Sequence, residues 1–311
     1  ARRLEISHLG EGGEKRSGRL EILLANLEET PGHRDTLLAL GQFLRGRGRH
    51  AELADVLTMQ ARRLESLGDK ASAVRLWAEV AGLAETPLGD LNRAIVSWER
   101  VVTLDNSPLA LDNLARLCAA SDEPLLAAQW LEQRMSLGTP SERRPAALRL
   151  ARAYMAAGQR QRAVASLERA LAEDANADEL WVMLTELYRD GERWEALVRA
   201  LSERCAQLED PDVVLACAQE ALTISNERLR NPSKAVPILV RALTLVPGER
   251  DLRLALADGL RASGHLAEAR GVLERVLEEY GRRQSRERAG LHYQVAQVAR
   301  DDVAGVPQYE F

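Results

Sequence analysis

Residues 154–171 read YMAAGQRQRAVASLERAL, and residues 260–277 read LRASGHLAEARGVLERVL. In both, a large residue is followed after four positions by glycine, and then by small or apolar residues at steps of five, four and three. Residues at i, i+3, i+4 and i+7 share one face of a helix. Each stretch therefore predicts a helix, a turn at Gly158 or Gly264, and a second helix. We expect the repeated unit to be an antiparallel helical hairpin.

The composition favours a folded protein made of thin layers of helices. The 311 residues are 46% hydrophobic and 29% charged, which is typical of globular rather than disordered chains. Only 4% are aromatic, so little bulky material is present for a thick central core, whereas Leu and Ala are abundant. The formal net charge of −5 gives no general attraction for nucleic acid, and we expect no nucleic-acid partner.

Cysteine and hydropathy indicate where the protein works. Cys118, Cys205 and Cys217 fall at apolar positions of predicted helices, where a reduced thiol acts as a small hydrophobic residue. Reduced cysteines favour the cytoplasm. No stretch approaches the ~18 continuous apolar residues of a membrane span, and residues 1–20 lack the apolar centre of a signal peptide. Nearly all basic residues are Arg, which indicates a GC-rich bacterial genome rather than a function.

The hairpin residues resemble the signature of the tetratricopeptide repeat (TPR) family. The matching positions are Leu150, Ala151, Tyr154, Gly158, Ala163, Leu167 and Ala170, followed by Trp181, Leu184 and Tyr188 in the next unit. The resemblance implies an all-α fold, a right-handed α-solenoid (superhelix) of stacked antiparallel hairpins. It covers nearly the whole chain as a single solenoid, 1–311. About seven repeats span 34–280, at 34–66, 69–105, 109–137, 143–174, 177–208, 211–246 and 249–280, with a partial repeat at 17–29, a partial or capping helix at 286–300 and a tail at 301–311.

Two repeats are longer than the others. The extra residues lie before the second helix, as PLGDLNRA at 87–94 and RLRNPSKA at 228–235, which are 141 residues apart. They predict a longer first helix or a longer turn, because Asp and Asn suit a helix start. We expect two copies of a four-hairpin block. Coincidental drift among degenerate repeats is the alternative.

No motif predicts catalysis, a cofactor or a metal. GEGGEKRSG at 10–18 contains the residues of a phosphate loop, but Glu14 separates Gly13 from Lys15 and no strand precedes it, so we expect a turn or disorder. The five His have no metal-ligand spacing. Trp77, Trp98 and Trp181 occupy core positions of the repeats, whereas Trp130 and Trp194 are open to surface contacts.

The resemblance implies that a ligand lies along the first helices, at fixed positions of each repeat. The fifth positions are Leu38, Arg75, Asp112, Leu148, Val182, Leu215 and Leu254. No repeat has the Lys and Asn pair with which chaperone-tail binders hold a terminal carboxylate. The predicted partner-binding residues are Leu148, Arg152, Val182, Arg189, Leu215, Leu254, Arg116 and Arg261. The alternative is that the apolar ones pack into neighbouring hairpins.

These patterns predict a non-catalytic scaffold or adaptor. Every long-range regularity serves stacking, and an apolar strip edged by Arg suits an amphipathic helix or a folded protein surface. Resemblance to large repeat arrays of GC-rich bacteria suggests work in regulation, polarity, motility or secretion assembly. The alternative is a regulatory or targeting arm of a larger enzyme. The oligomeric state is left open.

Overall fold

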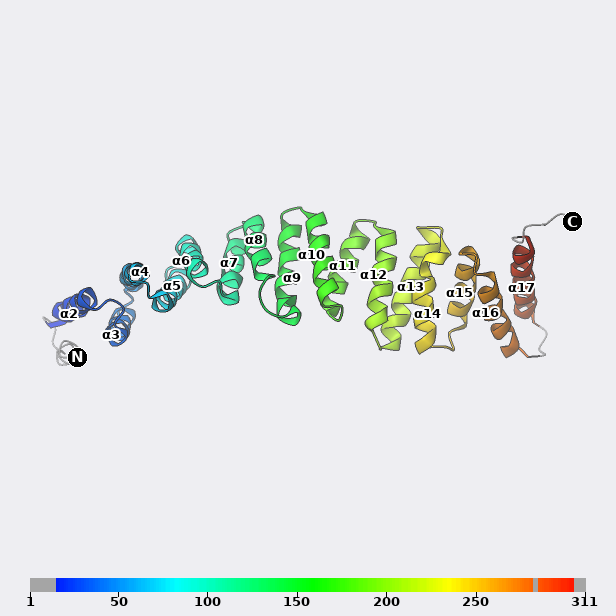
Figure 1. Ribbon diagram of the computed structural model, residues 1–311, viewed down its shortest axis with the longest axis horizontal. Coiled ribbons are helices and arrows are strands. Elements are labelled where there is room, and N and C mark those ends of the chain that lie inside the picture. Colours follow the sequence, from blue (N-terminus) through cyan, green and yellow to red (C-terminus); the bar gives the residue numbers. More distant parts are fainter. Residues whose placement is uncertain (1–14, 282–284, 305–311) are drawn as a thin grey trace. The chain divides into compact units, whose positions relative to one another are not determined.

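The computed structural model describes residues 15–281 and 285–304 (Figure 1), and these residues form helices and connecting loops without any strand. The predicted all-α class is confirmed. Residues 10–14 of the glycine-rich stretch lie outside the described part, and Lys15 begins a helix where the sequence predicted a turn. Residues 301–304, predicted as the start of a tail, belong to the last helix.

The sixteen α-helices and one 3-10 helix of the described residues follow one another through short loops. In chain order they are α2 (Lys15–Glu29), α3 (Arg34–Arg45), α4 (His50–Ser66), α5 (Lys70–Glu85), α6 (Leu91–Leu104), α7 (Pro108–Ala120), α8 (Pro124–Arg134), α9 (Pro140–Ala156), α10 (Arg160–Glu173), α11 (Asp178–Asp190), α12 (Trp194–Gln207), α13 (Pro211–Glu227), η1 (Pro232–Ala235), α14 (Val236–Leu245), α15 (Arg250–Ala262), α16 (Leu266–Glu279) and α17 (Arg286–Ala304).

The chain divides into two compact units, Ala1–Ala163 (unit 1) and Val164–Phe311 (unit 2). Within each unit, helices pack chiefly against their neighbours in the chain, as α4 does on α5 and α15 on α16. Each unit is thus an α-solenoid, a stack of hairpins. We call α3, α5, α7, α9, α11, α13 and α15 the first helices, and α4, α6, α8, α10, α12, α14 and α16 the second helices.

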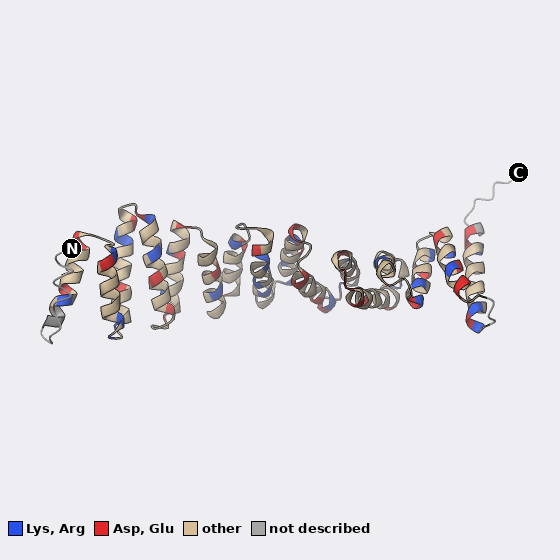
Figure 2. Ribbon diagram, turned by 90° about the horizontal axis from the view of Figure 1, so that it is seen from below, with Lys and Arg blue, Asp and Glu red and all other residues tan. Residues whose placement is uncertain are grey.

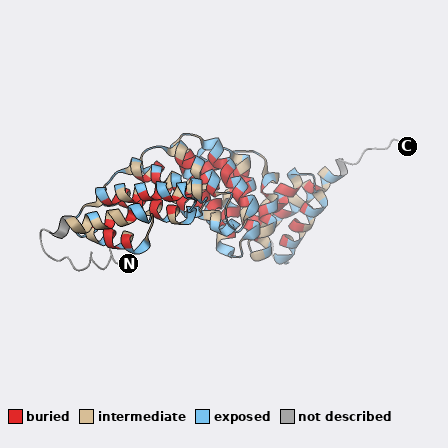
Figure 3. Ribbon diagram, turned by 60° about the vertical axis from the view of Figure 1, so that its left-hand side comes forward, coloured by how far each residue is buried: buried red, intermediate tan, exposed pale blue. Residues whose placement is uncertain are grey.

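Leu and Ala fill the spaces between helices, as the composition predicted. Figure 3 shows buried residues along the sides of the helices that face other helices. In unit 1, Leu40, Leu44 and Leu53 are fully buried, and Trp77 packs in the same cluster. Alanines such as Ala54 let helix backbones approach, while leucines fill the remaining volume. Stability therefore comes from contacts between neighbouring hairpins.

The two insertions lengthen both the first helix and the loop after it. Helices α5 and α13 have 16 and 17 residues, against 12 or 13 in α3, α7, α11 and α15. Helix α9 also has 17 residues although its repeat has no insertion, so the longer loop is the feature that distinguishes the two long repeats. After each long helix the chain turns through a residue with positive φ, Gly89 at 66° and Arg230 at 51°. The next residue, Asp90 or Asn231, caps the following helix with its side chain. The two loops are therefore alike.

One difference follows the loops. Leu91 begins an α-helix directly, whereas residues Pro232–Ala235 form a 3-10 turn before α14. No helix of the described residues is long and apolar enough to cross a bilayer. Nor does any group of three or more His, Cys, Asp and Glu side chains in that part have the arrangement of a metal site.

Candidate functional site

The predicted partner-binding residues all lie on first helices, but they are divided between the two units. Arg116 is on α7, and Leu148 and Arg152 are on α9, in unit 1. The members in unit 2 are Val182 and Arg189 on α11, Leu215 on α13, and Leu254 and Arg261 on α15. The structure therefore gives one row of these residues in each unit, and we describe each row separately.

The apolar members divide their surface between packing and solvent. Val182 is exposed, whereas Leu148, Leu215 and Leu254 are half-buried. A half-buried leucine contributes to the contact between hairpins and still presents carbon atoms to a ligand. The half-buried leucines are therefore compatible with both interpretations, packing between hairpins and contact with a partner.

Three of the four arginines bind carboxylates of the chain itself. Arg189 donates to Glu220 on α13 from Nε and Nη2, at 3.1 and 2.7 Å. Arg116 donates two hydrogen bonds to Glu85 on α5. Hydrogen bonding to Arg116 is the main cause of the lowered pKa of the Glu85 carboxyl. Arg261 pairs with Asp301 on α17. The first two ion pairs link successive first helices, and the third links α15 to α17. Figure 2 shows basic and acidic residues mixed along the helices.

Arg152 differs from these three arginines. Its side chain is exposed, and within the described residues it forms no ion pair. Among the four predicted arginines, Arg152 is therefore the one that forms no ion pair with a carboxylate of the described residues.

A hollow of about 250 Å³ lies between the first helices α3 and α5 in unit 1. Leu38 lies in it with 59% of its surface exposed. Leu37, Leu64 and Leu76 complete the apolar lining. Arg34, Arg45, Ser72, Arg75 and Glu79 supply its polar edge. The hollow joins the fifth-position residues of the first two repeats.

The edge of this hollow carries excess positive charge. Arg45 forms an ion pair with Glu79, which neutralises both. Arg75 donates to the Ser72 hydroxyl at 2.8 Å, and Arg34 is exposed; neither forms an ion pair with an acidic group of the described residues. Two guanidinium groups therefore lie beside an exposed leucine without an ion pair in the described residues, although the charge of Arg75 also helps to lower the pKa of Asp69.

The loop before α3 is fixed by specific contacts. Gly32 has φ of 72°, and a Cβ atom there would lie 2.8 Å from Leu64 Cδ2, so this position requires glycine. The amide of Gly32 donates to the buried Gln60 side chain at 3.1 Å. His33 accepts from the Thr36 amide as the cap of α3. One side of the hollow is thus rigidly placed.

The sequence named Leu38 and Arg75 as fifth-position residues but gave preference to the longer apolar run from Leu148 to Leu254. The missed signal was the alternation of Leu38 with Arg34 and Arg75 in adjacent repeats.

Two stretches of the chain match family models described as tetratricopeptide repeat, residues 146–179 and residues 228–286. The first contains the end of α9 and all of α10, and the second contains α14, α15 and α16. The chain contains tetratricopeptide repeats. The family resemblance noted in the sequence is thereby confirmed. No protein with a curated description matches the chain.

Several solved structures are similar at low sequence identity. YrrB, described as a TPR protein with an unusual peptide-binding site, is 17% identical over 58% of this chain and 89% of its own, with a TM-score of 0.35. A chain of the Naa15/Naa10 structure bound to HypK-THB is 16% identical over 99% of this chain and 48% of its own, with a TM-score of 0.47. Pseudomonas aeruginosa pilF is 16% identical over 72% of this chain and 95% of its own, with a TM-score of 0.35.

Proposed function

We propose that this chain is a non-catalytic protein–protein interaction scaffold, and that a partner segment binds in the hollow between α3 and α5. The exposed Leu38 between two unpaired arginines, Arg34 and Arg75, carries the proposal. An apolar side chain would cover Leu38, and a carboxylate next to it would accept hydrogen bonds from the guanidinium groups. The segment that fits is an acidic peptide with a bulky apolar residue.

The expected affinity of this hollow alone is low. Burial of a leucine-sized side chain contributes about 2 kcal/mol, and a charge-assisted hydrogen bond contributes about 2 kcal/mol. These two contributions must also offset the loss of translational and rotational freedom on association, so the hollow alone would bind a peptide more weakly than millimolar. A partner that binds more tightly must make further contacts along the same unit. We propose that Arg116, Leu148 and Arg152 on α7 and α9 supply them.

In unit 2 we propose a second contact surface on the first helices. Val182, Leu215 and Leu254 would provide apolar area, and Arg189 and Arg261 would hold an acidic group of the partner. Arg189 would have to exchange Glu220 for that group. Because exposed ion pairs contribute only about 0–1 kcal/mol, the exchange costs little.

A peptide display library selected on the intact chain tests the hollow in unit 1. We expect the enriched peptides to combine a large apolar residue with Asp, Glu or a terminal carboxylate. Fluorescence anisotropy should show binding weakened about tenfold or more by Leu38→Asp and by Arg75→Glu, a loss of about 1.4 kcal/mol. Leu109→Asp is the control, because Leu109 on α7 is 68% exposed and lies outside the hollow.

Selected peptides whose affinity is unchanged by Leu38→Asp and Arg75→Glu would contradict the assignment to this hollow. Val182→Asp and Leu215→Asp, checked for an unchanged thermal midpoint, then test unit 2. If binding survives these changes too, the partner does not bind along the first helices.

A further inference from the structure

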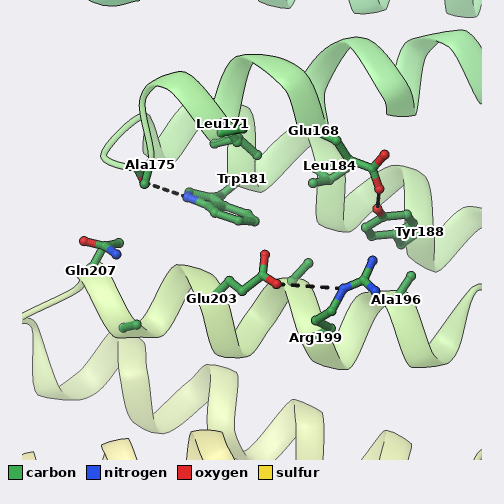
Figure 4. Close-up of a pocket in the computed structure, with 13 residues that line it drawn as sticks. Glu168, Leu171, Ala175, Trp181, Leu184, Tyr188, Ala196, Arg199, Glu203 and Gln207 are labelled. Carbon is green, nitrogen blue, oxygen red and sulfur yellow. Dashed lines mark hydrogen bonds and ion pairs between the residues drawn. The ribbon is translucent and has the colours of Figure 1, made fainter.

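The two cysteines of unit 2 lie on the buried faces of neighbouring helices. Cys205 shares one face of α12 with Val198 and Leu201, and Cys217 shares one face of α13 with Val214. Cys205 is fully buried, and Cys217 is 6% exposed. The hollow drawn in Figure 4 is lined by other residues of α12. The cysteines therefore belong to the contact between α12 and α13, which the proposed interactions do not use.

The two thiols touch each other across this contact. A hydrogen bond joins the side chains of Cys205 and Cys217, and both cysteines are free. A disulfide can form only between cysteines whose backbones are close. Side chains as short as cysteine bring their sulfur atoms into contact only in that case. The pair is therefore placed for a bond between the two sulfurs.

Two arginines hold the end of α12 that carries Cys205. Arg241 on α14 donates to the carbonyls of Cys205 and Leu208, at 3.3 and 2.7 Å. Arg204 pairs with Asp178 on α11 at 2.7 Å, and only 15% of the Arg204 side chain is exposed. These contacts tie the last turn of α12 to the helices on either side, so the position of the thiol is fixed. The two positive charges also favour a thiolate nearby.

The two thiols differ in how readily they ionise. The hydrogen bond from Cys205 lowers the pKa of Cys217 to about 7 because it stabilises the thiolate, while burial acts in the opposite direction. The same hydrogen bond, and after it burial, raise the pKa of Cys205, which keeps its proton. The thiolate is the reactive form of cysteine. Cys217 is therefore the attacking sulfur of the pair.

Cys118 on α7 is a matched comparison within the same chain. It is as fully buried as Cys205, and unit 1 contains no second cysteine. Burial raises the pKa of Cys118 to about 11, and the charges of Glu123 and Glu99 act in the same direction. A buried cysteine without a thiol neighbour is thus kept protonated. The contact between two thiols is the feature that sets the pair in unit 2 apart.

We propose that Cys205 and Cys217 form a reversible oxidation site, at which hydrogen peroxide or an organic hydroperoxide produces a disulfide between α12 and α13. The Cys217 thiolate attacks one peroxide oxygen, the O–O bond breaks, and the products are a sulfenic acid and a hydroxide (or alkoxide) ion that takes up a proton. The Cys205 sulfur then attacks the sulfenic sulfur, and its proton leaves with the hydroxyl group as water. A dithiol reductant returns two electrons and two protons by thiol–disulfide exchange.

The disulfide would restrain the part of unit 2 that carries one proposed contact residue. Leu215 lies two positions before Cys217 on α13. A bond between positions twelve residues apart removes freedom from the open states of the segment between them. Peroxide reaches the buried sulfurs during local opening of the helices, and the bond then limits that opening. The inference does not rest on the proposed interactions.

Mass spectrometry of the intact, fully reduced chain tests the proposal. The chain is treated with hydrogen peroxide, denatured and alkylated with iodoacetamide. Trypsin cleaves after Arg204 and Arg228, so Cys205 and Cys217 are on one peptide. We expect this peptide to lose two hydrogens and to escape alkylation, whereas Cys118 is alkylated. Dithiothreitol should restore alkylation of both. Alkylation of the pair to the same extent as Cys118 after peroxide treatment would overturn the proposal.

Two variants separate the roles of the sulfurs, and circular dichroism melts establish that each variant is folded. Cys205→Ser keeps a hydroxyl donor beside Cys217 and removes the second sulfur, so dimedone should trap a sulfenic acid on Cys217. In Cys217→Ser, dimedone should label Cys205 about tenfold more slowly or less, because that thiol stays protonated. Equal labelling in the two variants would overturn the assignment of Cys217 as the attacking sulfur. Cys118→Ser is the control, and its disulfide should form at the wild-type rate.

Hydrogen exchange measures the consequence of the bond. We expect amides of α12 and α13 to exchange more slowly in the oxidised chain than in the reduced one, and to recover when dithiothreitol is added. Amides of α7 and α8, near Cys118, should keep the same rate in both forms. A disulfide that forms without slowing exchange in α12 and α13 would overturn the claim that it restrains them.

Discussion

Three aromatic residues of the first helices share one mode of anchoring, whereas Trp181 donates to the Ala175 carbonyl instead. Trp77, Tyr154 and Tyr188 each donate a hydrogen bond to a glutamate of the preceding second helix. The respective acceptors are Glu65, Glu132 and Glu168. The sequence predicted Trp77 and Tyr188 as repeat positions from their spacing, but the acceptors depend on how one hairpin is set against the next. That offset is tertiary information, which the helical period does not contain.

Tyr188 should make the protein sensitive to alkali. Burial raises the pKa of Tyr188 to about 12, from an ordinary 10.0, because it disfavours the phenolate. Stability from this group is complete below about pH 10 and is lost as the pH rises through about 12. We expect Tyr188→Phe to lower the free energy of unfolding at pH 8 by about 1 kcal/mol through the lost hydrogen bond. Its stability should then fall less than wild type above pH 10, as measured by denaturant titration, and an equal fall would contradict the assignment.

Gly259 should resist replacement because α15 approaches η1 closely there. A Cβ atom at Gly259 would lie 2.7 Å from Val236 Cγ2 and 3.0 Å from the Pro232 carbonyl oxygen. We expect Gly259→Ala to destabilise the protein by about 1–3 kcal/mol through overpacking. Gly271→Ala is the control, since no neighbouring atom lies within 4 Å of its Cβ, and it should stabilise α16 by about 0.5–1 kcal/mol. Chemical denaturation that ranks the two changes in the opposite order would refute this.

At the scale of elements, the two long loops carry the same hydrogen bonds 141 residues apart. Leu88 and Leu229 donate from their amides to the carbonyls of Leu83 and Ile224. Asp90 and Asn231 donate to Ala84 and Ser225, both at 2.8 Å. The sequence predicted a longer helix or a longer turn, and the structure contains both. The duplication of a whole four-hairpin block stays a prediction.

The shared loop places different residues at its positive φ, which gives a paired test. Gly89 has open space around its Cβ position, so Gly89→Ala should cost about 1 kcal/mol through backbone strain alone. Arg230 already carries that strain, and Arg230→Gly should be neutral or stabilising by less than about 1 kcal/mol, after the greater entropy of an unfolded glycine is subtracted. Thermal denaturation of both variants measures the difference. Two losses of equal size would show that the loops are not equivalent.

At the scale of the whole molecule, the sequence predicted the hairpins, whereas it could not show which surface charges are paired, and the predicted site stays a prediction. A helical period reports which residues of one hairpin are buried, as it did for Leu150 and Leu167. The partners of surface arginines lie on another repeat, as Glu220 does for Arg189. The sequence therefore could not show that Arg189 forms an ion pair while Arg34 and Arg75 form none in the described residues.

The stacked architecture also predicts that damage stays local. Because helices contact mainly their neighbours in the chain, stability is approximately a sum of repeat and interface contributions. Leu273 on α16 is buried, and Leu273→Ala should remove about 2–5 kcal/mol from its surroundings. Hydrogen exchange read by mass spectrometry should then speed up in α15, α16 and α17 and stay at the wild-type rate in α3, α4 and α5. Leu53→Ala, a fully buried change in α4, should give the reverse pattern. If either variant instead accelerates exchange equally along the chain, stability is not a sum of repeat and interface contributions, and the stacked architecture does not confine damage to neighbouring hairpins.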